Sequence, residues 1–257
     1  MKKIRAGMGL GDALYLQSVV RHLVSKGQRL QVACEWPDVF RPLGDAIKII
    51  PFTRQGIHIL AHYSLRKGKT ETNQFQDCCI QAGITEPVEM RLDWTPRNAD
   101  LIEHLRSFGR PILCVQLPRS PMGRTDGFGA ELLPDCDVIQ AAIDRLKGRA
   151  LIVQIGSGRP LHKFSGIDVD LSNVTTVSDV LDIASIADAF LGYCSFIIPL
   201  AESFSKPCLA IWSRRGLRSG HPFIARITPR KIISKPTTRW VIDDEPEKLD
   251  EALHGFL

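Results

Sequence analysis

The stretch GMGLGDAL, from Gly7 to Leu14, predicts a tight turn between a strand and a helix. Its three alternating glycines permit a sharp turn, and Asp12 follows them at the start of an amphipathic segment. Glycine-rich loops often bind phosphate at such turns, but a carboxylate in the first helical turn repels an anion while it favours the helix dipole. Asp12 is therefore expected either to cap the helix or to act as a general base beside a cleft.

The segments on either side of this turn predict alternating strands and helices. In the first half, strands are expected at 2–9, 29–36, 46–52 and 56–63, and helices at 11–27, 70–84 and 98–109. The pattern restarts near Pro111, with strands expected at 111–118, 150–157, 189–194 and 207–212, and helices at 134–148, 177–188, 197–205 and 245–257. Such alternation is typical of parallel sheets covered on both faces. The sequence therefore predicts an α/β fold with two domains, 1–109 and 110–257, and a ligand cleft between them.

Composition narrows the class of protein. The chain has 257 residues, 44% of them hydrophobic and 24% charged, as globular proteins do. It has no apolar run of about 18 residues and no signal-peptide core, so we expect a cytoplasmic protein without a transmembrane segment. Its seven cysteines form no CxxC pair and are expected to be reduced. The net charge of +5 is concentrated between Ser213 and Arg239, which favours an anionic ligand.

The opening segment GMGLGDALYLQSVVRHLVSKGQRLQVACE resembles the start of the heptosyltransferase-type glycosyltransferases, glycosyltransferase family 9. Members begin with a strand, a glycine-rich turn, Gly-Asp-x-Leu and a helix, and Gly11, Asp12 and Leu14 match that motif. Further along, ALIVQIGSG and VSDVLDIASIADAFLGYCSFIIPLAESFSKPCLAIW resemble the donor-site region of the family in the order of their elements. The resemblance implies a GT-B fold, in which two Rossmann-like domains with parallel sheets face a central cleft.

The resemblance also implies an activity. A sugar would pass with inversion from a nucleotide-sugar, held mainly by the second domain, to an acceptor hydroxyl, without a metal or another cofactor. Asp12 would be the general base, and Gly9 and Gly11 would let the acceptor approach the backbone. The expected acceptor is a saccharide or glycolipid, while the basic excess also permits a nucleic-acid base.

Candidate donor-binding residues are expected at the ends of strands in the second domain. The resemblance implies a positive charge from Arg119 or Arg124. Residues that follow strands, and are placed to contact the nucleotide or its phosphates, are Ser157, Gly158, Arg159, Ser195, Arg214, Arg215 and Arg218. The alternative for each of them is a helix cap, an ordinary turn or a solvated loop.

Two features depart from the family pattern. Where the family has Asp-Ser-Gly-x-x-His, this chain has CSFIIP at 194–199, which keeps only Ser195. The segment RSPMGRTDGFGAELLPD, at 119–135, has no counterpart of the family's Lys-x-Trp-Pro. A catalytically inactive nucleotide-binding protein of the same fold is therefore the main alternative.

The sequence motifs of other functional classes match fewer residues of this chain. Gly7, Gly9 and Glu35 fit part of an NAD-binding fingerprint, but Asp12 stands where its third glycine is needed. The two histidines at 58 and 62 lie in a strand-like segment without a third ligand, so no zinc site is expected. No GxSxG motif of a serine hydrolase occurs. An NAD-dependent oxidoreductase is thus the third hypothesis.

Overall fold

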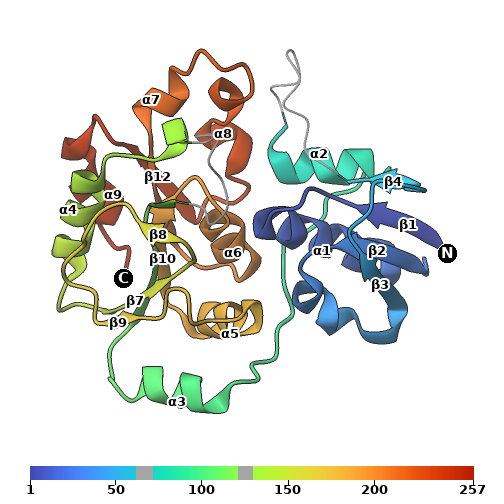
Figure 1. Cartoon of the computed structure of the whole chain (residues 1–257), viewed down its shortest axis with the longest axis horizontal. Helices are drawn as coiled ribbons and strands as arrows, with labels where there is room; N and C mark the ends of the chain where they lie inside the picture. The colour runs from blue at the N-terminus through green and yellow to red at the C-terminus, as the bar shows by residue number, and fades with distance from the viewer. Residues whose placement is uncertain (62–71, 121–129) are drawn as a thin grey trace.

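The computed structural model describes residues 1–61, 72–120 and 130–257. Within them, two parallel sheets are each flanked by helices, and the two units lie side by side (Figure 1). This arrangement confirms the predicted α/β fold with two parallel sheets.

The first sheet has the strand order β3-β2-β1-β4. Its strands are β1 (Lys2–Arg5), β2 (Leu30–Cys34), β3 (Ile47–Pro51) and β4 (Ile59–Leu60). Its helical segments are α1 (Leu10–Ser25), η1 (Pro37–Ala46) and α2 (Gln74–Gln81). Ile4 in β1 pairs in parallel register with Val32 and Ile59, so β1 is a central strand. The turn after β1 therefore opens at the carboxyl edge of this sheet.

The second sheet has the strand order β12-β11-β10-β5-β7-β9. Its strands are β5 (Ile112–Gln116), β7 (Leu151–Ile155), β9 (Val169–Asp170), β10 (Ala189–Tyr193), β11 (Cys208–Trp212) and β12 (Thr238–Ile242). Chain order thus proceeds outward from β5 to β7 and β9, then returns to β10 on the other side of β5. This is the doubly wound topology, whose switch point, where ligands typically bind, lies between β5 and β10.

Helices cover both faces of the second sheet. They are α4 (Cys136–Leu146), α5 (Val177–Ile186), α6 (Ile197–Ser203), α7 (Arg214–Leu217), α8 (Pro229–Ile232) and α9 (Leu249–Leu253), with short 3₁₀ turns η2 (Ala130–Leu132), η3 (Ile224–Arg226) and η4 (Pro246–Lys248). A two-stranded antiparallel ribbon pairs β6 (Arg119–Ser120) with β8 (Arg159–Pro160). The helix expected at 245–257 is reduced to η4 and α9, and Leu249 and Leu253 bury it against the second sheet.

The chain segment that connects the two sheets is hydrogen-bonded to both units along its length. Ser18 Oγ in α1 donates to the carbonyl of Arg91, and the backbone N–H of Leu92 donates to the carbonyl of Ser203 at the end of α6. The fully buried Asp182 in α5 accepts hydrogen bonds from Trp94 Nε1 and from the backbone N–H groups of Arg97 and Asn98. These contacts bind the connection to both units.

Helix α3 (Ala99–Arg106) follows this connection, with Asn98 as its N-cap, as expected. It packs against α5, a helix of the second sheet (Figure 1). In sequence, the predicted boundary at 109 assigns α3 to the first domain, whereas in space it lies with the second.

The two units contact each other through α1 and α6 and through α2 and α8. Tyr15 in α1 donates its hydroxyl hydrogen to the carbonyl of Ile232, at 3.2 Å. Lys231 in α8 forms an ion pair with Asp77 in α2, with 2.5 Å between Nζ and Oδ2, and both side chains are almost fully buried. One continuous hydrophobic cluster includes residues of both units.

Candidate functional site

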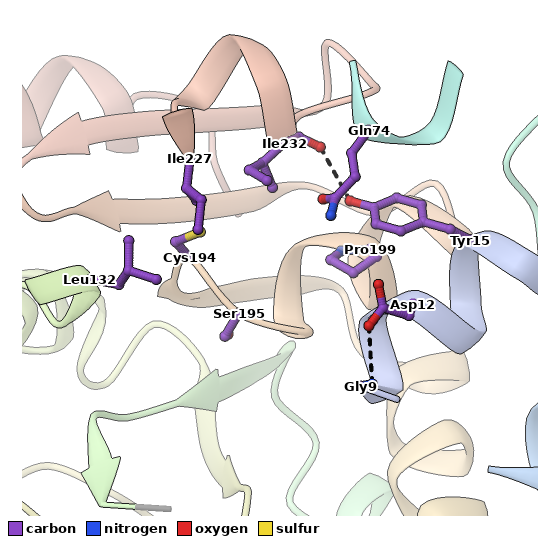
Figure 2. Close-up of a pocket in the computed structure, with 11 residues that line it drawn as sticks. Gly9, Asp12, Tyr15, Gln74, Leu132, Cys194, Ser195, Pro199, Ile227 and Ile232 are labelled. Carbon is purple, nitrogen blue, oxygen red and sulfur yellow. Dashed lines mark hydrogen bonds between the residues drawn. The ribbon is translucent and has the colours of Figure 1, made fainter. Parts of the chain in front are cut away.

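A pocket of about 180 Å³ lies where the two units meet. The turn after β1 and helices α1 and α2 form one side of it, and residues that follow β10, together with α6 and α8, form the other (Figure 2). The predicted site residues Gly9, Gly11, Asp12 and Ser195 all line this pocket. The structure thus brings the expected base and one expected donor contact together from opposite units.

Asp12 both caps α1 and lines the pocket. Its Oδ2 accepts a hydrogen bond from the backbone N–H of Gly9, the N-cap residue, at 3.0 Å. Figure 2 shows this bond, with the second carboxylate oxygen on the side away from Gly9. Asp12 is therefore the third helical residue and caps α1 from inside the helix. The expectation that Asp12 is the N-cap is therefore wrong, because Gly9 holds that position, whereas the role of Asp12 as a general base stays a prediction.

Gly7 leaves space for this carboxylate. A β-carbon on Gly7 would lie 2.3 Å from Asp12 Oδ2, and one on Gly9 would lie 3.1 Å from it. The turn after β1 thus surrounds an anion that belongs to the protein itself. Because like charges repel, this turn is a poor site for the diphosphate of a dinucleotide, and the geometry weighs against the NAD-binding interpretation.

Gly11 brings the two units close together. A β-carbon on Gly11 would lie 3.2 Å from Cγ of Pro199 and 3.6 Å from Cα of Phe196, both at the start of α6. From the sequence, this glycine is expected to let an acceptor approach the backbone. In the structure, the groups that approach it most closely belong to the second unit.

Ser195 lies at the topological switch point of the second sheet. It follows β10, and its Oγ donates a hydrogen bond to Oε1 of Gln116, the last residue of β5. The same Oγ lies 3.4 Å from the backbone nitrogen of Ile197, which begins α6. Gln116 was not among the site residues predicted from the sequence. The available signal was its place at the end of the first strand of a predicted doubly wound sheet.

Arg119 and Gly158 are engaged in the protein away from this pocket. Arg119 is buried, its Nη1 donates to the carbonyl of Gly158 at 2.7 Å, and its Nη2 donates to Ser172 Oγ at 2.6 Å. The backbone N–H of Gly158 donates to Asn173 Oδ1 at 2.7 Å. Arg119 also lines a separate pocket of about 400 Å³ at the ends of β7 and β9. The neighbouring predicted residues, Ser157 and Arg159, are exposed.

The basic residues after β11 do not line the pocket between the units either. Arg214 forms ion pairs with Asp244, at 2.7 Å, and with Glu245, at 2.8 Å. Arg215 donates to the backbone carbonyl of Ala130, and Arg218 is exposed. Arg214 and Arg215 belong to helix α7 and not to a loop. The remaining donor candidate, Arg124, lies outside the described residues.

Burial keeps the other ionisable groups of the pocket neutral. It raises the pKa of the Cys194 thiol to about 12 and the pKa of the Tyr15 hydroxyl well above its usual value. Both residues line the pocket, together with Gln74 at the start of α2. Tyr15 and Gln74 were not predicted from the sequence, and Cys194 was predicted only as a departure from the family's donor turn. A thiolate nucleophile is therefore not available from Cys194.

The described residues contain no group of three or more His, Cys, Asp or Glu side chains placed to hold a metal ion. His58 accepts a hydrogen bond from the backbone N–H of Lys3 at 3.0 Å, and His62 is outside the described residues. All seven cysteines are free thiols. No described helix combines the length and the apolar character that a membrane span requires.

Solved structures share this fold across the chain. The glycosyltransferase family 9 protein from Veillonella parvula DSM 2008 matches with a TM-score of 0.68 at 8% identity, over 99% of this chain and 97% of that one. ADP-heptose LPS heptosyltransferase II from E. coli matches with a TM-score of 0.61 at 12% identity, over 100% and 98%. The iron-containing dodecameric glycosyltransferase TibC from enterotoxigenic E. coli H10407 matches with a TM-score of 0.60 at 17% identity.

The match to TibC covers 92% of this chain and 63% of that one, so this chain spans less than two thirds of the length of TibC. No protein-family model and no curated protein matches the sequence. At sequence identities this low, the structural similarity establishes the fold alone. The two sheets therefore form the pair of Rossmann-like domains of a heptosyltransferase-like, GT-B structure, as the sequence predicted.

Proposed function

Given this heptosyltransferase-like fold, we propose that the protein is an inverting glycosyltransferase with Asp12 as its general base. One observation carries the proposal: Asp12 of the first unit and Ser195 of the second line the same pocket. A base and a donor-binding residue are needed on opposite sides of the reacting carbon. That residues of both units line one pocket supports this arrangement.

The proposed reaction is a single displacement. The acceptor hydroxyl oxygen attacks the anomeric carbon of the donor sugar, and the carboxylate of Asp12 takes the hydroxyl proton. The bond from the anomeric carbon to the diphosphate oxygen breaks, and the nucleoside diphosphate leaves with the electron pair. Attack from the face opposite the leaving group inverts the anomeric carbon. General-base assistance of this kind contributes about 10²–10⁴-fold in rate.

The leaving diphosphate is assigned to the switch point between β5 and β10. Ligands of doubly wound sheets bind outside the carboxyl ends of the strands at this point, and Ser195 and Gln116 mark it here. In this proposal, fixed hydrogen-bond donors stabilise the departing charge without a metal. The nucleotide-sugars of related structures support a donor of this class: TibC has been solved with ADP-D-β-D-heptose and E. coli WaaC with ADP-2-deoxy-2-fluoro heptose.

The donor enters in a more open arrangement of the two units. The pocket's volume of about 180 Å³ is below the roughly 300–1,000 Å³ of sites for larger organic ligands. Beside it, the units approach so closely that a β-carbon on Gly11 would lie 3.2 Å from Cγ of Pro199. Separation of α1 from α6 would enlarge the site, and closure would then exclude water from the reacting carbon.

The test combines binding and turnover. Thermal unfolding is followed with ADP, GDP, UDP and dTDP, with their hexose conjugates, and with NAD⁺ and NADP⁺. A ligand at about 100 times its Kd stabilises the native state by about 2.7 kcal/mol. Release of nucleoside diphosphate is then measured with saccharide acceptors for the wild type and Asp12→Asn. The asparagine retains an oxygen to accept the Gly9 N–H, so we expect unchanged nucleotide binding and about 10²–10⁴-fold slower turnover.

The outcomes separate the hypotheses. Stabilisation by NAD⁺ or NADP⁺ alone would overturn glycosyl transfer. Nucleotide binding without turnover would favour the second candidate, an inactive nucleotide-binding protein. That candidate has a specific observation in its favour: Pro199, which lacks a side-chain hydrogen-bonding group, packs against Gly11 beside the expected base.

A further inference from the structure

Gln74 presents its side-chain amide to the pocket between the units. It is the first residue of α2, it is 7% exposed, and it lines the pocket between the units. No hydrogen bond within the described parts of the chain engages its side-chain amide. Figure 2 shows that amide directed into the pocket beside Tyr15. The side chain is largely buried while its amide faces the pocket, so a polar ligand group is the natural partner for it.

The other polar side chains of the pocket already form hydrogen bonds within the protein. Tyr15 donates to the carbonyl of Ile232, and Ser195 donates to Gln116. Asp12 accepts from the backbone of Gly9. These groups can still accept hydrogen bonds, whereas the amide of Gln74 offers N–H donors as well. A ligand hydroxyl, which donates and accepts, matches this set.

The rest of the pocket wall offers few hydrogen-bond partners for further hydroxyl groups of a ligand. Its side chains are Leu132, Cys194, Pro199, Ile227 and Ile232. A hydroxyl buried against them without a partner would cost about 1–3 kcal/mol by protein mutational data. The volume of about 180 Å³ suits a small ligand unit. The pocket therefore has the dimensions and the lining for one ring that carries few hydroxyls.

Resting on the proposed glycosyl transfer, we infer that the transferred sugar is a 6-deoxyhexose, recognised through one of its ring hydroxyls by Gln74. The methyl group at C6 meets the aliphatic wall formed by Leu132, Ile227 and Ile232. The amide of Gln74 pairs with a ring hydroxyl, and the anomeric carbon lies between Asp12 and Ser195. Gln74 thereby determines specificity, while Asp12 performs the proton transfer.

The experiment compares nucleotide-sugars that share a nucleotide and differ only at C6. The probes are GDP-mannose with GDP-6-deoxymannose, dTDP-glucose with dTDP-6-deoxyglucose, and UDP-N-acetylglucosamine with its 6-deoxy analogue, titrated calorimetrically into the full chain. GDP, dTDP and UDP alone report the nucleotide contribution. We expect the 6-deoxy member of the recognised pair to bind about 10- to 100-fold more tightly, because an apolar pocket discriminates against one added hydroxyl by about that factor.

Gln74→Met tests the residue itself. Methionine has a similar length and no hydrogen-bonding amide, so affinity for the 6-deoxy conjugate should fall about 10-fold while affinity for the nucleoside diphosphate stays the same. The melting temperature should stay close to that of the wild type, because within the described residues the amide makes no hydrogen bond that the substitution would break. Gln81→Met, at the exposed end of the same helix, is the matched control and should leave the binding of every probe unchanged.

The possible results distinguish a failure of the 6-deoxyhexose assignment from a failure of the proposed glycosyl transfer. Equal or tighter binding of the hexose members, with nucleoside diphosphates bound, overturns the 6-deoxyhexose assignment and leaves glycosyl transfer standing. A lower melting temperature of Gln74→Met with unchanged sugar binding assigns Gln74 a structural role and also overturns it. Absence of binding by any diphosphate or conjugate overturns the proposed function and this inference together.

Discussion

The carboxylate of Asp12 occupies the space that a side chain on Gly7 would need. A β-carbon at Gly7 would lie 2.3 Å from Oδ2 and 2.5 Å from Cγ of Asp12. The same carboxylate accepts the N–H of Gly9. The glycine-rich turn and the aspartate are therefore one structural unit, in which the glycine makes the position of the carboxylate possible.

Gly7→Ala should consequently destabilise the protein through Asp12. The new methyl group forces the carboxylate away from the N–H of Gly9, and overpacking of this kind costs about 1–3 kcal/mol. In an Asp12→Ala background the methyl group meets no carboxylate, so the cost should largely disappear. Urea unfolding of the two single variants and the double variant measures this coupling. Additive costs would show that the two residues act independently.

Gly11→Ala should weaken the contact between the units. Its β-carbon would lie 3.2 Å from Cγ of Pro199, so α1 or α6 must shift. We expect a loss of about 1–3 kcal/mol in unfolding free energy and faster hydrogen exchange at the start of α6. Gly220→Ala is the matched control, because a β-carbon there meets nothing within 4 Å. Equal effects of both substitutions would contradict a close approach at Gly11.

Because Lys231 and Asp77 form a buried ion pair, we expect the losses in unfolding free energy on replacing them to be strongly non-additive. Lys231→Met leaves the buried Asp77 carboxylate without this partner and should cost about 3–5 kcal/mol. Replacing both residues, with methionine and leucine, removes the uncompensated charge and should cost much less than the sum of the two single variants. Denaturant unfolding measures all three variants. A double variant as unstable as that sum would refute the interpretation.

The buried carboxyl group of Glu202 should make the free energy of unfolding depend on pH. Its carboxyl group is fully buried and accepts hydrogen bonds through Oε1 from the backbone of Ser234 and Lys235, while Oε2 has no hydrogen-bond partner among the described residues. Burial raises its pKa above the usual 4.5. The folded state therefore holds this proton more tightly than the unfolded state does, and this contribution to stability is lost as pH rises through the folded pKa.

Glu202→Gln should remove that contribution, because the amide carries no charge and can still accept at the Oε1 position. Unfolding free energies measured between pH 4 and pH 8 for both proteins give the comparison. The wild type should lose stability relative to the variant as pH rises. A constant difference across this range would show that Glu202 does not titrate there.

Local patterns predicted most of the elements and failed where the pattern is short or the element lies at a sheet edge. The strand at 150–157 and the helix at 134–148 appear as β7 and α4 because long apolar and amphipathic runs encode them. Edge strand β12 was missed, since Arg239 and the half-exposed Trp240 interrupt its apolar pattern. Of the strand expected at 56–63, residues 62 and 63 lie outside the described part of the chain, and within 56–61 the structure has β4, which pairs with β1 at Ile59 and Leu60.

The sequence by itself determined the parallel α/β architecture and the place of Asp12 at the start of a helix, because burial periodicity and helix starts depend on residues a few positions apart. Only the tertiary structure decided which residues share the pocket. Gln116 and Ser195 are 79 positions apart, and Gly11 meets Pro199 across the two units. Gln74 becomes an inward-facing amide only once α1, α2 and α8 have packed together. Local spacing cannot specify such pairs, because they depend on how whole elements pack.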